Sequence, residues 1–203
     1  MFVRDLLIDP ALRSSSDISH TVVAVSSSTN KDRAAKFIEQ SGIPASAKCK
    51  AYGSYEELVA DPNVDVVYVA TPHSHHFQNV MLALNAGKNV LCEKAFTVNA
   101  KQARILCETA KQKNLFLMEA VWTRYFPLSV QVRDLIRKGE IGEVLRVIAD
   151  NSFGDDVERA WGTEHRMVNK ELAGGALLDC KGLSLLRLFN FHANQYTQWA
   201  STH

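Results

Sequence analysis

The stretch VDVVYVATPHSHHFQNVMLALNAGKNVLCEKA, residues 64–95, decides the fold of this chain. Residues 64–70 are almost all apolar and β-branched, which predicts a strand buried on both faces of a parallel sheet. Pro72 ends this strand because proline has no N–H to donate to a sheet. Apolar side chains then recur at helical spacing from Phe77 to Leu84, and residues 88–92 form the next strand.

Polar residues follow both strands of this strand–helix–strand unit. Residues 71–76 come after the first strand, and residues 92–95 come after the second. The carboxyl ends of parallel strands meet at one edge of the sheet, where open α/β sheets bind their ligands. The two segments are therefore the first candidates for a functional site.

The rest of the chain continues the same alternation as far as residue 139. This order predicts an α/β fold with a doubly wound, parallel, Rossmann-like sheet. We expect residues 1–122 to form one domain and residues 123–203 to begin a second, with a strand over 143–153. The other expected strands lie within 21–26, 47–52 and 115–120, and further helices run through 34–38, 55–59, 103–110 and 128–136.

Composition narrows the class of protein. The 203 residues are 46% hydrophobic and 22% charged, with a net charge of +1, as in ordinary globular proteins. This charge gives no reason to expect nucleic acid or a membrane as a partner, and no apolar run is long enough to span a bilayer. The four cysteines show no C-x-x-C spacing, which favours reduced thiols and a cytoplasmic location.

Three motifs in order resemble a known family. Ala70–His76, ATPHSHH, resembles the A-T-P-N-x-x-H turn of the Gfo/Idh/MocA oxidoreductases, and Cys92–Ala95, CEKA, resembles their C-E-K-P. Met118–Pro127, MEAVWTRYFP, resembles the branch that holds dimeric dihydrodiol dehydrogenases and fungal NADP-dependent D-xylose 1-dehydrogenases. The resemblance extends from Phe2 to Asp179. It implies that residues 1–122 are a partial dinucleotide-binding domain and that residues 123–203 begin an α+β substrate and oligomerisation domain.

The resemblance implies hydride transfer between NADP and a small molecule, either a D-xylose-like sugar or a trans-dihydrodiol, in a possible homo- or hetero-oligomer. It places Lys94 at the nicotinamide ribose and the reacting hydroxyl, as the catalytic residue. A carbinol that loses hydride must also lose a proton, so a base or a cation is required there. Glu93 is expected to orient Lys94 or to accept a hydrogen bond from a ribose hydroxyl. The alternatives are a solvated lysine and a surface carboxylate.

The turn after the first strand is expected to face the cofactor. The resemblance assigns cofactor contacts to Thr71, Pro72, His73 and His76, although His73 replaces the family's Asn. A metal site is the alternative, because three histidines occur within this turn. No cysteine or carboxylate motif completes a ligand set nearby, so we expect no metal.

Two further groups of residues are candidates for cofactor contacts. Ser27 and Ser28 end a strand where an acidic residue would select NAD, and Arg33 lies just downstream, which favours NADP. The alternative is a serine cluster that caps a helix. Trp122 and Arg124 combine an aromatic ring with a cation, which suits stacking on nicotinamide or a sugar. Core packing at a domain junction is the alternative for this pair.

The sequence also departs from the family pattern. It has no G-x-G-x-x-G turn, and the strand that precedes that turn would lie in the middle of the sheet. Leu183 stands where the dihydrodiol dehydrogenase branch has a catalytic Tyr. We therefore expect a chain truncated at both ends with weak or no catalysis, so whether it is an enzyme stays open. The alternative is a non-catalytic fragment that pairs with an intact homologue.

Overall fold

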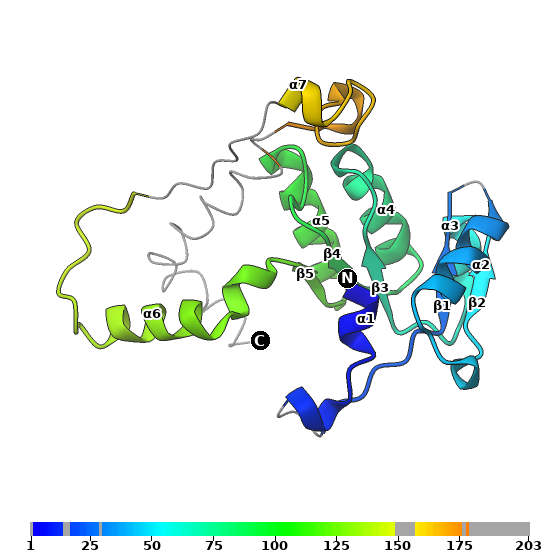
Figure 1. The fold of residues 1–203 in the computed structure, drawn as a ribbon, viewed down its shortest axis with the longest axis horizontal. Helices are drawn as coiled ribbons and strands as arrows, with labels where there is room; N and C mark the ends of the chain where they lie inside the picture. The colour runs from blue at the N-terminus through cyan, green and yellow to red at the C-terminus, as the bar shows by residue number, and fades with distance from the viewer. Residues whose placement is uncertain (1, 14–16, 29, 149–156, 176–177, 179–203) are drawn as a thin grey trace. The chain divides into compact units, whose positions relative to one another are not determined.

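The computed structural model describes residues 2–13, 17–28, 30–148, 157–175 and 178 (Figure 1). Every structural statement below refers to these residues. The chain divides into two compact units, one within residues 1–67 and 81–90, the other within residues 68–80 and from 91 onward. This division differs from the boundary expected after residue 122, which stays a prediction.

The first unit contains a small parallel sheet with helices. Strand β1 pairs with β2 so that Ala24 lies opposite Lys50 and Ser26 opposite Tyr52. Helix α2 packs against both strands. The elements are α1 (Phe2–Leu6), β1 (Ala24–Ser26), α2 (Lys31–Gln40), β2 (Lys50–Tyr52) and α3 (Tyr55–Ala60), with 3-10 helices at Pro10–Arg13 and Ala45–Ala47.

Side-chain caps explain where the helices of this unit begin. Asn30 Oδ1 accepts a hydrogen bond from the Asp32 amide at 2.8 Å, at the start of α2. Ser54 Oγ accepts from the Glu57 amide at 3.2 Å, at the start of α3. The Glu57 carboxylate reaches back to the Gly53 amide at 3.1 Å, one residue before the Ser54 amide of an ordinary capping box. Local sequence therefore sets both helix starts.

A second sheet has three strands in the order β3-β4-β5. Residues 64–95 supply β3 (Val66–Val69), α4 (His73–Asn85) and β4 (Asn89–Cys92). They are followed by α5 (Ala100–Gln112) and β5 (Leu117–Glu119). The apolar face of α4 buries Val80 and Leu84 completely, and Val90 of β4 and Leu106 of α5 are equally buried. These four side chains are among the most deeply buried hydrophobic ones of the described residues.

The described strands form two separate sheets instead of one continuous sheet. The missing central strand expected from the sequence stays a prediction. Strand β3 lies at one end of its sheet, and Val66 is 52% exposed. The prediction that residues 64–70 are buried on both faces is wrong at Val66, because the described residues leave about half of it uncovered.

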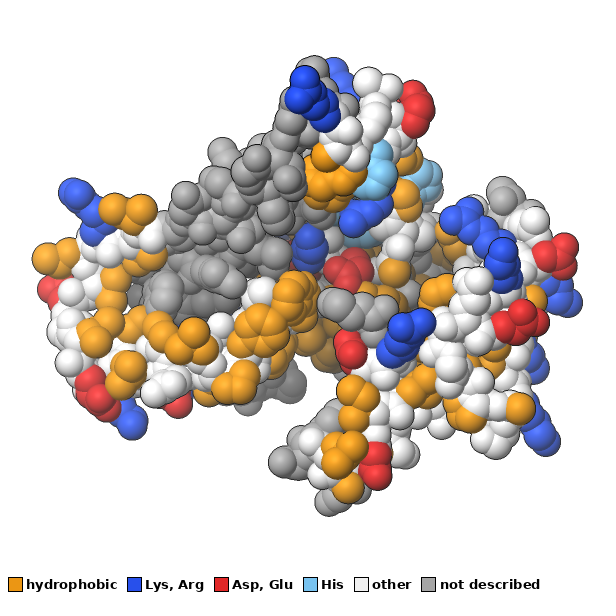
Figure 2. Space-filling model, viewed as in Figure 1, with side chains coloured by type: hydrophobic (Ala, Val, Ile, Leu, Met, Phe, Trp, Pro, Cys, Tyr) orange, Lys and Arg blue, Asp and Glu red, His pale blue; other side chains and the backbone are white. Residues whose placement is uncertain are grey.

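The chain after β5 contains short helices and α6. The elements are 3-10 helix η3 (Trp122–Tyr125), α6 (Pro127–Arg137), α7 (Val157–Ala160) and η4 (Lys170–Leu172). Hydrophobic side chains gather along α6, among them Leu128, which is 70% exposed (Figure 2). The strand expected over 143–153 is not found in its described part, 143–148. Leu145 is exposed there and no described strand pairs with the segment, so its backbone lacks sheet partners.

Candidate functional site

The structure brings together the segments that follow β3, β4 and β5. The Glu93 amide donates to the Val69 carbonyl at 2.9 Å, which fixes the end of β4 beside the end of β3. The Ala120 amide donates to the Cys92 carbonyl at 2.7 Å, which fixes the end of β5 beside β4. The turn at residues 71–76 and the segment at 93–97 thus share one edge of the sheet, as expected for a ligand site.

His76 joins two of these segments. Its side chain is completely buried in the first turn of α4. Nδ1 lies 2.8 Å from the Ala95 carbonyl oxygen, and Nε2 lies 2.8 Å from the Thr71 carbonyl oxygen. Burial lowers the pKa of His76, whereas the two carbonyl oxygens and Glu93 act in the opposite direction. The ring therefore faces the backbone, although its sequence motif suggested a contact with ligand.

The other residues of this turn are also held in place. Thr71 Oγ1 accepts a hydrogen bond from Asn79 Nδ2 at 3.1 Å, and the Pro72 carbonyl accepts from the His75 amide at 2.9 Å. His73 is 8% exposed, and its Nδ1 lies 3.0 Å from the carbonyl oxygen of Ala173. The turn is therefore packed against a segment a hundred residues further along the chain.

Glu93 and Lys94 sit between these fixed points. The Lys94 amide donates to Glu93 Oε2 at 3.1 Å, and the Tyr68 hydroxyl donates to Glu93 Oε1. The Lys94–Ala95 peptide bond is cis. Burial and then the hydrogen bond to Glu93 raise the pKa of Tyr68, so its hydroxyl keeps its proton and acts as a donor. The carboxylate before Lys94 is thereby oriented from two sides.

Glu119 completes the arrangement at the end of β5. Its Oε1 accepts a hydrogen bond from the Phe96 amide at 2.8 Å. Burial raises the pKa of Glu119, the nearby Glu93 raises it further, and the Phe96 amide lowers it. The sequence analysis did not predict Tyr68 or Glu119 as site residues. Each could have been found as a polar side chain within, or at the end of, an otherwise apolar strand.

The candidate residues for cofactor selection lie in the first unit. The Ser27 amide continues the sheet by donating to the Tyr52 carbonyl at 3.3 Å. Ser28 and Arg33 are exposed, after β1 and in the first turn of α2. Asn30 caps α2, so the serines are not its N-cap. The alternative interpretation required these serine side chains to cap α2, and they do not.

Trp122 and Arg124 lie in η3, just after β5. Trp122 is 45% exposed and packs edge-on against Phe126, with ring centroids 5.1 Å apart. Arg124 is half-buried, and its carbonyl accepts a hydrogen bond from Arg133 Nη1 at 2.8 Å. The aromatic contact fits packing at the start of α6, and enough of the indole is exposed for a ligand to stack on it.

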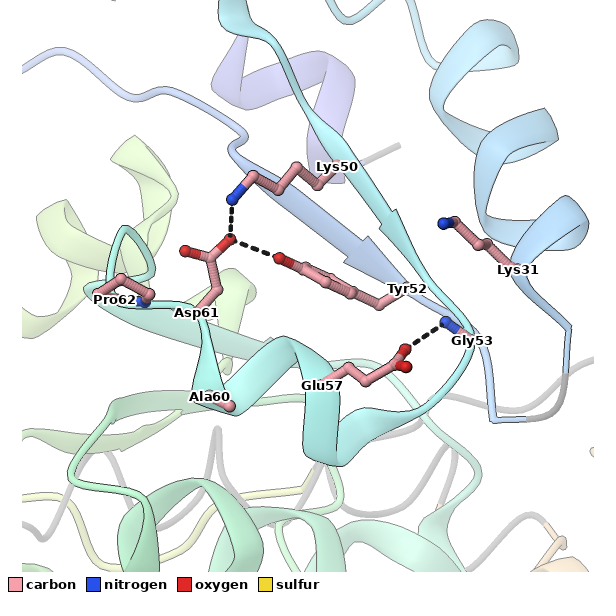
Figure 3. A pocket seen from close by; sticks show the side chains of 8 residues that line it. All are labelled: Lys31, Lys50, Tyr52, Gly53, Glu57, Ala60, Asp61 and Pro62. Carbon is pink, nitrogen blue, oxygen red and sulfur yellow. Dashed lines mark hydrogen bonds and ion pairs between the residues drawn. The ribbon is translucent and has the colours of Figure 1, made fainter.

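A cavity of about 760 Å³ lies in the first unit, lined by Lys31 and by residues of 50–62 (Figure 3). Asp61 in its wall has a side chain only 1% exposed, and accepts from Tyr52 at 2.7 Å and Lys50 at 3.1 Å. These polar groups satisfy one another, which favours a structural role. None of the cofactor-binding residues expected from the sequence lines this cavity.

Metal and membrane features were also sought within the described ranges. No three His, Cys, Asp or Glu side chains gather there as metal ligands would, so the turn histidines do not form such a group among themselves. No helix in the described part of the chain is long and apolar enough to cross a membrane. The prediction that the protein needs no metal stays a prediction.

Known proteins resemble the chain in sequence and fold. It is 62% identical over 182 residues to D-xylose 1-dehydrogenase (NADP(+)) of Hypocrea jecorina, covering 88% of this chain and 46% of that protein. It is 44% identical to trans-1,2-dihydrobenzene-1,2-diol dehydrogenase of Danio rerio, covering 83% and 47%. An NAD-binding oxidoreductase structure from Klebsiella pneumoniae aligns with a TM-score of 0.77 at 28% identity, covering 93% and 49%.

The chain thus spans about half the length of the curated relatives it matches. The model of one family, described as an oxidoreductase family with an NAD-binding Rossmann fold, matches residues 6–121. That range contains β1 to β5, the turn at 71–76 and the segment at 93–97 that carries Lys94. The chain belongs to the Gfo/Idh/MocA oxidoreductase family.

Proposed function

We propose that the chain binds NADP and that Lys94 meets the nicotinamide ribose and the reacting hydroxyl of the substrate. One observation carries the proposal: Lys94 lies between two fixed neighbours at the carboxyl end of the sheet. Glu93 is held by Tyr68, and Ala95 lies against the His76 ring. The backbone that carries Lys94 is thus held on both sides, and a cation on a fixed backbone suits the stabilisation of a developing alkoxide.

The proposed reaction is oxidation of a sugar such as D-xylose, or of a trans-dihydrodiol. Bound NADP supplies the hydride acceptor. The residues of this chain have two tasks: Lys94 accepts the hydroxyl proton or stabilises the alkoxide, and Glu93 orients Lys94. The names of the relatives from Hypocrea jecorina and Danio rerio support these two substrate classes.

The choice of NADP over NAD rests on the segment after β1. No acidic residue stands at Ser27 or Ser28 to bind a ribose 2′-hydroxyl, and the exposed Arg33 suits a 2′-phosphate. The relative from Hypocrea jecorina is named as an NADP enzyme, which supports the same choice.

Low turnover is part of the proposal. Leu183, outside the described residues, stands where the family branch has a catalytic Tyr. We therefore expect measurable NADPH binding with little or no D-xylose oxidation. A cytoplasmic location is proposed from the cysteines, because Cys49, Cys92 and Cys107 are free thiols. Self-association, or association with a homologue, is also proposed.

The decisive experiment is a titration of the purified chain with NADPH, followed by nicotinamide fluorescence. Lys94→Ala is expected to weaken saturable binding about tenfold, the cost of one charge-assisted contact. Lys113→Ala is the matched control, because Lys113 lies at the far end of α5 and is exposed. Equal affinity in the two variants, or no saturable binding by folded wild-type protein, would contradict the proposal.

A second candidate function is a non-catalytic fragment that pairs with an intact homologue. The specific observation is the end position of β3, where Val66 is 52% exposed and no described strand covers the outer side. Co-expression with a full-length homologue, followed by size exclusion, tests it. Val66→Lys should abolish co-elution, because a charge on an edge strand discourages pairing. Val98→Lys, in a loop, should not change it, and separate elution of the wild-type chains would exclude this candidate.

A further inference from the structure

His76 contacts two backbone oxygens with one ring. Both contacts measure 2.8 Å, Nδ1 to Ala95 and Nε2 to Thr71, and the side chain is completely buried. Because the ring is buried, water cannot replace either carbonyl as its partner. Carbonyl oxygens only accept hydrogen bonds, so each hydrogen bond needs a proton on the ring nitrogen concerned.

The number of ring protons decides how many of these hydrogen bonds form. A neutral imidazole carries one N–H, so it donates to one carbonyl and turns a lone pair toward the other. An imidazolium carries two N–H groups and donates to both. Because both oxygens already lie at hydrogen-bond distance, protonation adds the second bond without any movement of the backbone.

The charged and titratable surroundings come from three elements. On α4, His73 packs edge-on with its ring centroid 5.6 Å from that of His76. After β4, Glu93 attracts the imidazolium, and the neighbouring Cys92 thiol stays neutral because burial raises its pKa to about 12. At the end of β5, burial and Glu93 raise the pKa of Glu119. Burial lowers the pKa of His76 itself, so the ring gains its second proton only below its ordinary value of 6.5.

We propose that His76 is the positioning residue for Lys94: its Nδ1–H holds the Ala95 carbonyl, and full protonation of the ring ties the turn after β3 to the segment after β4. Lys94 is one peptide unit from Ala95, and the Phe96 amide is fixed on the other side by Glu119. The inference rests on the proposed role of Lys94. It adds a residue that acts through the backbone and touches neither substrate nor cofactor.

The first test uses wild-type protein without cofactor, so it does not depend on NADP binding. Histidine ring signals and backbone amide signals are followed by NMR between pH 5 and 8. We expect the ring of His76 to gain its second proton below pH 6.5, and the amides of Lys94 and Ala95 to shift along the same titration curve. Lys94 and Ala95 amides that do not follow the His76 titration would overturn the inference.

Two substitutions separate the two ring contacts. In His76→Asn the amide nitrogen takes the place of Nδ1 and keeps the contact with Ala95, whereas in His76→Gln it takes the place of Nε2 and keeps the contact with Thr71. We expect NADPH binding to weaken about fivefold in His76→Gln, the size of one hydrogen bond, and to change little in His76→Asn. The loss in His76→Gln should be larger at pH 5.5 than at pH 7.5.

Matched controls assign the effect to Lys94. His75→Gln, in the same turn of α4, should bind NADPH like wild type. In a Lys94→Ala background, His76→Gln should cause no further loss, because the two residues act as one unit. Equal weakening by His76→Asn and His76→Gln would contradict the role of the Ala95 contact. Absent NADPH binding by wild type would instead defeat the proposed function, while the NMR titration still tests His76.

Discussion

The Tyr68 hydroxyl, on β3, donates a hydrogen bond to the carboxylate of Glu93, which follows β4 and immediately precedes Lys94. Two adjacent strands are thus joined by their side chains as well as by the Glu93 amide, which bonds the Val69 carbonyl at 2.9 Å. One carboxylate oxygen of Glu93 accepts a hydrogen bond from the Tyr68 hydroxyl, and the other accepts one from the Lys94 amide. The orientation of Glu93 therefore depends on a residue that is 25 positions earlier in the chain.

Removing the Tyr68 hydroxyl should destabilise the fold and loosen Glu93. Tyr68→Phe leaves a half-buried carboxylate without its side-chain donor, so the free energy of unfolding should fall by about 1–3 kcal/mol. Urea denaturation at pH 7 measures this change. Tyr55→Phe, on α3, is the control and should change the stability by less than about 0.5 kcal/mol. Equal stability of the two variants would show that the bond to Glu93 contributes nothing.

Glu119→Gln should stabilise the protein at neutral pH. The folded-state pKa of Glu119 is raised, so its contribution to stability is full below the unfolded pKa and is lost as pH rises through the folded value. Gln keeps an oxygen for the Phe96 amide and carries no charge. Its melting temperature should exceed that of wild type by about 2–4 °C at pH 7 and match it at pH 4. Glu56→Gln, at an exposed site on α3, should show no such pH dependence.

Asp61→Asn should destabilise the first unit at neutral pH and lose this effect in acid. The Asn63 amide, Tyr52 and Lys50 hold the pKa of Asp61 well below its usual range. The stability it contributes is therefore present above about pH 4 and falls as pH drops through the depressed folded value. Thermal unfolding at pH 7 and at pH 3 measures the change. A pH-independent difference from wild type would rule out this ionic contribution; exposed Asp65→Asn is the control.

Arg33→Ala should reduce the preference for NADPH over NADH. Arg33 is exposed in the first turn of α2, where it can pair with a 2′-phosphate that NADH lacks. We expect the ratio of the two dissociation constants to change about tenfold, with NADH binding almost unaffected. Lys36→Ala, one turn further along α2 and also exposed, is the control. Equal losses for both cofactors would assign Arg33 a general charge effect instead.

The sequence predicted the strand and helix order well because the signals are local. Asn30 caps α2 and Ser54 caps α3, just before the helical segments expected over 34–38 and 55–59. Pro127 begins α6, one residue before the helical segment expected over 128–136. The turn and the Glu93-Lys94 segment were placed at one edge of the sheet by the alternation of strands and helices alone. These features depend on neighbours within a few residues along the chain.

The roles of single side chains at the site were decided by contacts between distant residues. His76 stands 19 positions before Ala95, and only the folded sheet directs its ring at that carbonyl. The sequence predicts Val66 to be a core residue, yet Val66 is exposed. The burial of a strand residue depends on which elements pack around it in the fold.

The sequence by itself thus determined the family, the order of the elements and the motif that carries Lys94. Tertiary structure decided which polar groups hold that motif, Tyr68, His76 and Glu119. The physical reason is that local propensity acts over a few residues. Burial, hydrogen-bond partners and shifted pKa values arise only where separate segments meet.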